Sequence, residues 1–591
     1  MKNSNLLTIA TVLLTLAACG GGGGGGSASS ALSTNADLAD LSISAGTLDP
    51  PFSSDTYAYL VGPQEMFVHG SVTLTPLAAH AGATITVDGL VVASGTPSSV
   101  IDVPATVTPV LVRVTAEDGE SVREYNVIIT RQGLSMQTDY VKASNTGGND
   151  RFGYSVALDG DTLVVGADYE ASNATGVDGD QLDHSAPHSG AVYVFFRHLN
   201  GTWFQEAYLK ASNTGAGDAF GQSVALDGDT LVVGADGEDS NATGVNGNQL
   251  DNSAPWSGAA YVFVRSDGIW SQQAYLKASN TDSDDAFGQS VALDGDTLVV
   301  GANEASNATG VNGNALDNSA SSSGAAYVFF RSGGTWSQQA YLKASNTDAS
   351  DFFGWSVALD GDTVVVGADS ESSNATGVNG NQLDNSADSS GAAYVFVRSD
   401  GIWSQQAYLK ASNTESNDTF GTSVALDGDT LMVGADGEDS NATGVNGNQL
   451  DNSSNRSGAA YVFVRSDGTW SQQAYLKASN TGAGDVFGRS LALDGDTLVV
   501  GASSEDGGTL LNNLPESGAA YVFVRSGGIW SQENYVKALD TESADGFGVS
   551  VALDGGTLLV GAWGEDSNAT GVNGNQFDNS ASFSGAAYLF K

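Results

Sequence analysis

Short runs of apolar residues alternating with polar ones, bounded by Gly, Asp and Asn, recur along most of the chain. In residues 221–278 four such runs read GQSVAL, TLVVGA, GAAYVFVR and WSQQAYLKA. The segments LDGDT and RSDGIW join the first and the second pair of runs, and Asp-Gly tolerates the positive φ that tight hairpin turns require. The pattern predicts a unit of four antiparallel strands.

This unit occurs in seven copies. The copies begin at Phe152, Phe220, Phe287, Phe353, Phe420, Phe487 and Phe547. A long, nearly fixed period is typical of repeat architectures, in which one unit cannot bury its faces without its neighbours. Seven four-stranded copies predict an all-β fold with a seven-bladed β-propeller.

The two ends of the repeat region predict how the ring closes. The last copy ends with its third strand, GAAYLFK, at residues 585–591. The segment DYVKASN at residues 139–145 precedes the first copy and matches the fourth-strand sequence AYLKASN. We expect this segment to supply the outer strand of the last blade and so to remove an open sheet edge.

Each copy contains Phe-Gly and, further along, Gly-Ala, as in FGQSVALDGDTLVVGA at residues 220–235. This pattern resembles the FG-GAP repeat, and residues 136–591 are similar to the propeller of integrin α chains in a bacterial form. The glycines of both pairs are expected to let neighbouring backbones approach closely near the axis. The tryptophans that open the fourth strands, which we expect to pack between blades, are Trp203, Trp270, Trp336, Trp403, Trp470 and Trp530.

Residues 37–131 lack this repeat but also show short alternating runs. Val110, Val112 and Val114 alternate with Leu111 and Arg113, which predicts a strand with one buried side. Several such strands over this length predict a small β-sandwich. The sequences LSISAGTLDPPFSSDTYAY and VTAEDGESVREYNVIITR resemble the cadherin-like β-sandwich of bacterial surface proteins. The resemblance implies a spacer or adhesive module without catalytic residues.

The N-terminal residues 1–18 are typical of a signal peptide, with Lys2 before an apolar run. The sequence LAAC at residues 16–19 resembles the bacterial lipobox, which implies cleavage before Cys19 and a lipid on its sulfur. An ordinary secretory signal is the alternative. Residues 19–36 are rich in Gly and Ser and predict a flexible tether. Gly20 is not the Asp that retains lipoproteins in the inner membrane, so we expect the outer membrane or cell surface.

The chain carries 68 acidic and 21 basic residues, a net charge of −47. Because only 15% of residues are charged while 41% are apolar, the composition indicates a folded protein with an acidic surface. Nucleic acid is not an expected partner, since phosphate binding requires clustered Lys and Arg. An acidic surface suits divalent cations or solubility in salty water.

A long segment joins the second and third strands of most copies, as in residues 236–257. Loops of this length are usually functional, and Ca²⁺ takes about six to eight oxygen ligands. The candidate calcium ligands in these loops are Glu170, Asp178, Asp180, Asp183, Glu238, Asn246, Asn248, Asp251, Glu304, Asp317, Glu371, Asp384, Glu438, Asp451, Glu565 and Asp578. The alternative is self-capped turns, because Asn and Asp also favour Asx turns. The integrin-type calcium loop, D-x-D-x-D-G between strands one and two, is replaced here by LDGDT.

A second acidic residue recurs two positions before each of the seven phenylalanines. These residues are Asp150, Asp218, Asp285, Asp351, Asp418, Asp485 and Asp545. An Asp in a connection most often caps a turn by accepting backbone N–H bonds. The other interpretation is a ring of carboxylates around the axis that holds cations or a cationic ligand.

The sequence contains no motif for nucleophilic, metalloprotease or phosphate-loop chemistry, so no catalytic residue is assigned. We expect a lipid-anchored surface protein that adheres through a repetitive acidic face to an extracellular glycan or protein, with Ca²⁺ as its one candidate cofactor. Two alternatives stay open. The first is an enzyme that acts on an extracellular polysaccharide through a pair of carboxylates, and the second is a structural spacer.

Overall fold

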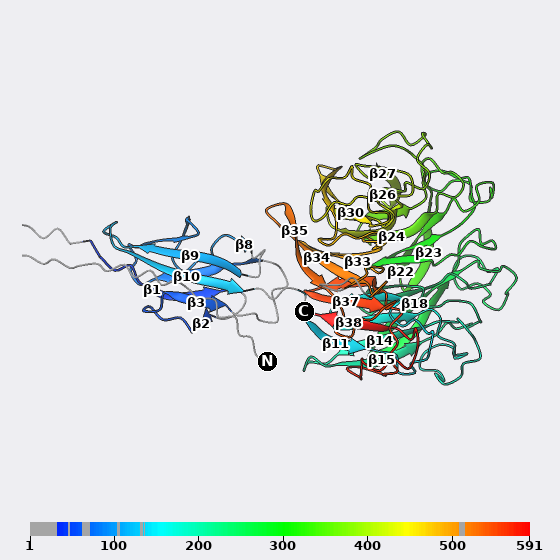
Figure 1. Cartoon of the computed structure of the whole chain (residues 1–591), viewed down its shortest axis with the longest axis horizontal. Coiled ribbons are helices and arrows are strands. Elements are labelled where there is room, and N and C mark those ends of the chain that lie inside the picture. The colour runs from blue at the N-terminus through cyan, green and yellow to red at the C-terminus, as the bar shows by residue number, and fades with distance from the viewer. Residues whose placement is uncertain are drawn as a thin grey trace, which may run out of the picture.

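The computed structural model describes residues 32–44, 48–61, 71–102, 107–130, 134, 136–507 and 514–591. Every regular element in these residues is a β-strand (Figure 1). No helix in this part of the chain is long and apolar enough to cross a membrane. The predicted signal peptide, Cys19 and the tether up to residue 31 lie outside the described residues.

The first unit is built from ten strands. They are β1 (Leu38–Ile43), β2 (Leu48–Asp49), β3 (Ala58–Val61), β4 (Ser71–Val72), β5 (Leu74–Ala78), β6 (Thr84–Val87), β7 (Leu90–Val92), β8 (Ile101–Asp102), β9 (Val107–Thr115) and β10 (Val122–Thr130). The main sheet has the order β2-β3-β10-β9-β6-β7, and β3 runs parallel to β10. The pairs β1-β5 and β4-β8 form two small further sheets.

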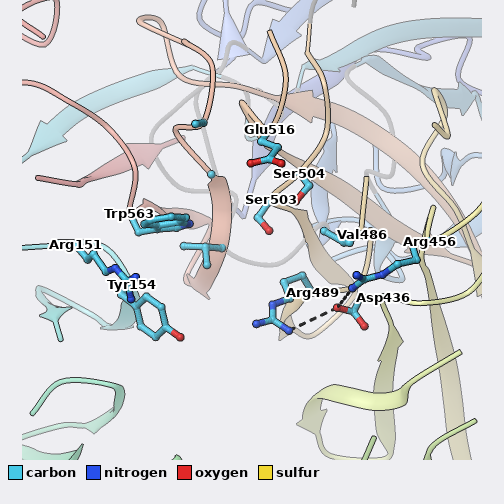
Figure 2. A pocket seen from close by; sticks show the side chains of 13 residues that line it. Arg151, Tyr154, Asp436, Arg456, Val486, Arg489, Ser503, Ser504, Glu516 and Trp563 are labelled. Atoms are coloured by element: carbon cyan, nitrogen blue, oxygen red, sulfur yellow. Dashed lines mark ion pairs between the residues drawn. The ribbon is translucent and has the colours of Figure 1, made fainter. Parts of the chain in front are cut away.

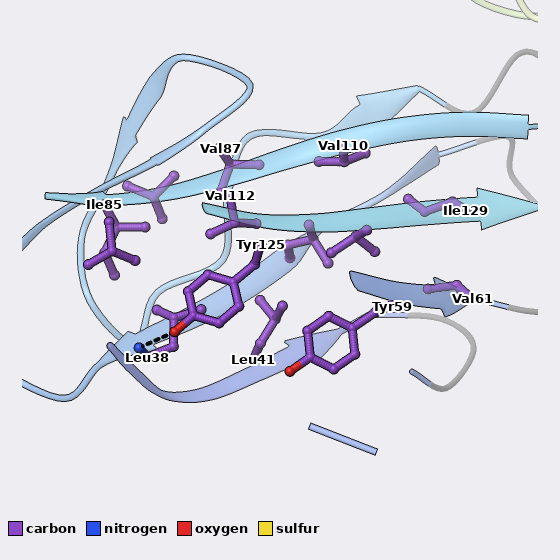
Figure 3. Packing of buried hydrophobic residues seen from close by; sticks show 14 of the residues in the cluster. Leu38, Leu41, Tyr59, Val61, Ile85, Val87, Val110, Val112, Tyr125 and Ile129 are labelled. Carbon is purple, nitrogen blue, oxygen red and sulfur yellow. Dashed lines mark hydrogen bonds between the residues drawn. The ribbon is translucent and has the colours of Figure 1, made fainter. Parts of the chain in front are cut away.

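The core of this unit confirms the predicted alternation along β9. Val110 and Val112 are buried, whereas Leu111 is 36% exposed. Figure 3 shows these valines facing Tyr125 and Leu38 in one apolar cluster. The hydroxyl of Tyr125 accepts the backbone N–H of Leu38 at 2.9 Å, which joins the β1-β5 pair to the main sheet.

The second unit consists of seven four-stranded antiparallel sheets, the blades. Blades one to three contain β12 (Ser155–Asp159), β13 (Thr162–Ala167), β14 (Ala191–Arg197), β15 (Trp203–Leu209), β16 (Ser223–Asp227), β17 (Thr230–Ala235), β18 (Ala259–Ser266), β19 (Ile269–Leu276), β20 (Ser290–Asp294), β21 (Thr297–Ala302), β22 (Ala325–Ser332) and β23 (Thr335–Leu342). Blades four to six contain β24 (Phe353–Asp360), β25 (Thr363–Ala368), β26 (Ala392–Ser399), β27 (Ile402–Leu409), β28 (Phe420–Asp427), β29 (Thr430–Ala435), β30 (Ala459–Ser466), β31 (Thr469–Leu476), β32 (Ser490–Asp494), β33 (Thr497–Ala502), β34 (Ala519–Ser526) and β35 (Ile529–Val536). Blade seven contains β36 (Phe547–Asp554), β37 (Thr557–Ala562), β38 (Ala586–Phe590) and β11 (Gln137–Val141).

The ring is closed by the segment before the first blade. β11 pairs antiparallel with β38, and Figure 1 shows the two strands side by side. The inner strands of neighbouring blades contact one another all the way around, and β36 contacts β12. On the face with the tight turns, Asp554 of blade seven accepts the N–H of Gly160 in blade one at 2.8 Å. These contacts are those of a closed seven-bladed propeller.

Small residues bring adjacent blades together near the axis. A Cβ on Gly234 would overlap the carbonyl oxygen of Gly288 in the next blade, and Ser223 donates its hydroxyl to that oxygen at 2.7 Å. Further out, Trp270 is 3% exposed and its Nε1 donates to Glu206 of the preceding blade at 2.9 Å. The close approach of the glycines and the packing of Trp270 between blades are both as predicted.

Candidate functional site: the long-loop face

Two sets of connections share one face of the propeller, because the strands within each blade are antiparallel. They are the loops from the second to the third strand and the connections from the fourth strand to the next blade. We call this the long-loop face. The opposite face carries the two-residue Asp-Gly turns of the first hairpins, such as the turn at Gly228 (φ 55°).

The recurrent Glu of the long loops is buried in every blade and paired with a buried or nearly buried Lys. The pairs are Glu170–Lys210, Glu238–Lys277, Glu304–Lys343, Glu371–Lys410, Glu438–Lys477, Glu505–Lys537 and Glu565–Lys142, with N–O distances of 2.7 to 3.3 Å. Lys142 reaches Glu565 from the strand that closes the ring. A pair of this kind therefore ties each outer strand to the start of a long loop.

The oxygens of Glu238 show how completely these carboxylates are used. They accept hydrogen bonds from Lys277 Nζ (2.9 Å), the Tyr275 hydroxyl (3.0 Å), Asn213 Nδ2 (2.8 Å) and the backbone N–H of Ser240 (3.1 Å). Burial lowers the pKa of Lys277, and the charge of Glu238 opposes that shift. Four donors surround this carboxylate, so its oxygens are already used in hydrogen bonds within the fold.

The other candidate calcium ligands bind the backbone of their own loop or of the adjoining strand. Asn246, at φ 55°, accepts the N–H of Tyr275 at 3.0 Å, and Asp178 of blade one accepts that of Tyr208 in the same way. Side-chain oxygens that accept an N–H two residues ahead belong to Asp180, Asp183, Asn248, Asp251, Asp317 and Asp578. The main-chain carbonyls of Asp384 and Asp451 accept from Asn374 and Asn441.

These contacts correspond to the self-capped turns that were the alternative to calcium. Across the described residues, no group of three or more His, Cys, Asp or Glu side chains is placed to hold a metal ion. The oxygen-bearing residues of six blades thus recur together with the hydrogen bonds that hold their loops.

The recurrent Asp before each Phe also caps a turn. Asp218 accepts the N–H of Gly215 at 2.7 Å and is 4% exposed. Equivalent bonds are made by Asp150, Asp285, Asp351, Asp418, Asp485 and Asp545. Burial raises the pKa of these carboxyls to between about 6 and about 8.

Six long loops also hold an apolar side chain in solvent at the same position of the loop. These residues, which we call the apolar loop tips, are Leu182 (79% exposed), Leu250 (85%), Leu316 (81%), Leu383 (85%), Leu450 (82%) and Phe577 (69%). Every one of them is followed by an Asp. Sequence reasoning missed them, although an apolar residue inside an otherwise polar loop in six copies was a visible signal.

The backbone around each loop tip is well ordered by hydrogen bonds. Asn213 from the connection before the blade donates to the carbonyl of Gln249 at 3.2 Å. Leu250 donates its N–H to Asn248 Oδ1 at 3.2 Å, and Asn241 donates to the carbonyl of Asp251 at 3.0 Å. The loop thus holds Leu250 outward from a defined backbone.

Three positions near the axis differ from copy to copy, whereas the strands around them are nearly identical. The residue before Phe-Gly is Arg151, Ala219, Ala286, Phe352, Thr419, Val486 or Gly546. The residue after Phe-Gly is Tyr154, Gln222, Gln289, Trp355, Thr422, Arg489 or Val549. The residue after Gly-Ala is Asp168, Asp236, Asn303, Asp369, Asp436, Ser503 or Trp563. Comparing the copies column by column would have found these positions, which sequence reasoning also missed.

Comparison with known proteins agrees with this architecture. The FG-GAP repeat model matches residues 136–195, 203–263, 270–329, 336–396, 403–463, 470–523 and 530–590, and the cadherin-like β-sandwich model matches residues 38–132. A protein of Evansella cellulosilytica, described as a candidate membrane protein, is 37% identical over 102 residues. That match covers 17% of this chain and 15% of the length of the relative.

Similar solved structures share little sequence with the chain. The WD40 domain of Toxoplasma gondii coronin aligns with a TM-score of 0.35 and 6% identity, over 78% of this chain and 85% of that one. A quinoprotein alcohol dehydrogenase-like protein of Bacteroides thetaiotaomicron gives 0.31 and 9%, over 81% and 94%. A puromycin-hydrolysing peptidase of Mycobacterium tuberculosis gives 0.34 and 10%, over 74% and 53%. The seven matched repeats, which fill the seven blades, show that the chain belongs to the FG-GAP repeat family and carries a cadherin-like β-sandwich in front of its propeller.

Proposed function

We propose that this chain is a lipid-anchored surface adhesion protein whose long-loop face binds an extracellular protein. FG-GAP repeats and cadherin-like modules indicate a surface or adhesion-type protein and are typically non-catalytic. The lipobox-like LAAC with Cys19 supports the anchor, and the Gly/Ser-rich segment after it supports a tether.

The observation that carries the proposal is the set of apolar loop tips. Burying one Leu side chain stabilises a complex by roughly 1.5 to 3 kcal/mol before other terms are counted. A single exposed apolar side chain is ordinary on a protein surface, but recurrence at the same loop position in six blades is not accounted for by chance exposure. Here an apolar side chain, Leu in five loops and Phe in one, recurs around the long-loop face on hydrogen-bonded backbone, so little loop ordering is required on binding.

The charge around these tips indicates the kind of partner. Leu250 is followed by Asp251, and the same order recurs at the other five tips. Each tip thus carries its own acidic neighbour in a chain whose net charge is −47, so the surroundings of the tips attract basic surfaces and repel acidic ones. The partner that fits is therefore an extracellular protein with a basic surface and apolar pockets.

A capture experiment with matched variants tests this proposal. The full chain is immobilised and exposed to surface proteins of the organism that makes it. One variant changes Leu182, Leu250, Leu316, Leu383, Leu450 and Phe577 to Ser. A control variant changes the exposed apolar residues of the opposite face, Ile269, Ile402 and Ile529, to Ser. We expect a basic partner that the wild type and the control retain and the loop variant loses. Equal capture by both variants would contradict the proposal.

A further inference from the structure

Almost every Lys and Arg side chain of the propeller pairs with an acidic residue, and the same pair occurs at the same position in successive blades. The lysines of the outer strands pair with the buried glutamates described above. Arginines at the ends of the third strands pair with an Asp of the opposite face and lie over a Trp. Arg331, for example, lies 2.6 Å from Asp296 and 5.1 Å from the ring of Trp336. These cations are therefore already neutralised by the fold.

Three arginines of the propeller stand outside this scheme, namely Arg151, Arg456 and Arg489. All three line a single cavity of about 390 Å³ (Figure 2). In a chain with 68 acidic and 21 basic residues, such a gathering does not follow from composition. It follows from the divergence of the copies, because Arg151 and Arg489 occupy positions where no other blade has a basic residue.

The cavity is assembled from four blades on the long-loop face. Asp436 follows β29 in blade five, Ser503 follows β33 in blade six, Trp563 follows β37 in blade seven, and Tyr154 precedes β12 in blade one. These four residues belong to the copy-variable positions. Because the residues at these positions differ between blades, they line one asymmetric cavity and not a site that is repeated in every blade.

The arginines of the cavity are only loosely paired, and Arg151 lies 3.5 Å from the carboxylate of Asp168, which is not in the cavity wall. Arg489 and Arg456 share a single carboxylate, that of Asp436, at 3.6 and 3.9 Å. Charge-assisted hydrogen bonds are usually about 2.7 to 2.9 Å long, so these contacts leave guanidinium donors free for a ligand. The side chains of Arg456 and Arg489 are 58% and 40% exposed. The one other acidic residue in the wall is Glu516.

Aromatic rings form the side of the cavity opposite Asp436 (Figure 2). The guanidinium of Arg151 lies 3.6 Å from the ring centre of Tyr169 and 5.1 Å from that of Trp563. Trp563 stacks on Phe583 with ring centres 5.5 Å apart. The indole is thus held in place, and it lines the cavity with a flat apolar surface.

We propose that this cavity binds an anionic saccharide, with its carboxylate or sulfate groups on Arg456, Arg489 and Arg151 and one sugar ring on Trp563. Guanidinium forks match the planar oxygens of carboxylates and the oxygens of sulfates. Ser503, Ser504 and Glu516 supply polar groups for sugar hydroxyls. The apolar loop tips do not line this cavity, so a test of saccharide binding does not depend on the outcome of the adhesion test.

Titration calorimetry on the full chain tests the proposal with four probes: digalacturonate, galactose 6-sulfate, neutral digalactose and sodium sulfate. We expect binding of one or both anionic sugars and none of the neutral disaccharide. Arg489→Gln and Arg456→Gln should each weaken binding at least tenfold. The single variant Trp563→Leu should weaken binding more than either arginine variant. Arg331→Gln on the opposite face is the matched control and should leave the affinity unchanged. Arg456 is the more exposed of the two arginines, so its variant serves if Arg489→Gln does not fold.

Several outcomes would overturn the assignment. Binding of digalactose as tightly as digalacturonate would remove the role of the arginines. Equal affinity for sodium sulfate and the anionic sugars would leave an anion site without a sugar subsite. Unchanged affinity in both arginine variants, or no heat from any anionic probe at millimolar concentration, would show that the cavity is not the binding site.

Discussion

Lys210 Nζ lies 3.0 Å from Glu170 Oε2 across the interior of blade one, and the two side chains are 0% and 1% exposed. The same ammonium also donates to Ser189 Oγ at 2.7 Å. Because a buried charge is stable only when it is paired and hydrogen-bonded, this pair specifies where the long loop meets the outer strand. Its recurrence in all seven blades fixes where each loop begins.

Removing one partner of such a pair should be costly. Lys277→Met leaves Glu238 buried without its cation, and loss of one partner of a buried pair typically costs about 3 to 5 kcal/mol. We expect this loss in denaturant unfolding of the full chain. The double variant Lys277→Met, Glu238→Gln should recover part of it. Asp229→Asn breaks an exposed pair with Arg265 and should cost less than about 1 kcal/mol. If Lys277→Met lowers the free energy of unfolding by no more than Asp229→Asn does, the structural role of the buried pair is contradicted.

The buried aspartates predict that stability falls as the pH rises. Burial raises the pKa of Asp351 and Asp418 from 3.8 to about 8 and that of Asp150 and Asp485 to about 6. Folding therefore favours their protonated form, so their contribution is full below about pH 4 and is lost as the pH rises through about 6 to 8.

The corresponding measurement is the thermal midpoint of the full chain between pH 5 and pH 8 at constant ionic strength. We expect a higher midpoint at pH 5. Asp418→Asn keeps an acceptor for the N–H of Glu415 and should reduce the difference between the midpoints at pH 5 and pH 8. Asp267→Asn changes an Asp at an exposed turn and should leave the difference between the two midpoints unchanged. A midpoint that rises toward pH 8 would show that these carboxyls do not govern the pH dependence.

Closure by β11 predicts that the propeller depends on residues 136–145. Their removal exposes the edge of β38 and takes Lys142 away from Glu565. A chain that starts at residue 146 should melt at a lower temperature and self-associate in light scattering, whereas one that starts at residue 136 should stay monomeric. Equal behaviour of both truncations would contradict a structural role for β11.

Chelation tests the calcium alternative directly. Glu238 accepts from four donors, and Asn246 and Asn248 accept backbone N–H groups, so EDTA followed by Ca²⁺ should leave the thermal midpoint of the full chain unchanged. A ligand that binds only the folded state must raise the midpoint. A rise with Ca²⁺ would show that the folded chain binds this cation and would support the loop residues as its ligands.

Local patterns predicted the strands, because alternation lies within a copy. The recurrence of the copies predicted the seven blades, the closing strand and the packing of Trp270. The partners of Glu238 were not predicted, because Lys277 lies 39 residues away and Asn213 comes from the connection before the blade. A Lys recurring in seven apolar fourth strands was nevertheless a signal for a buried counter-ion. Predicting the cavity around Arg489 would have required an alignment of the seven copies, because its lining residues are at positions that differ between the copies.

The most direct test of the account is hydrogen–deuterium exchange of the full chain with and without the basic partner that the capture experiment isolates. The account predicts slower exchange in the segments that hold the apolar loop tips, such as residues 248–252, in several blades. Exchange at the Asp-Gly turns of the opposite face should not change. Protection confined to the opposite face or to the β-sandwich would contradict the claim that the long-loop face is the binding surface.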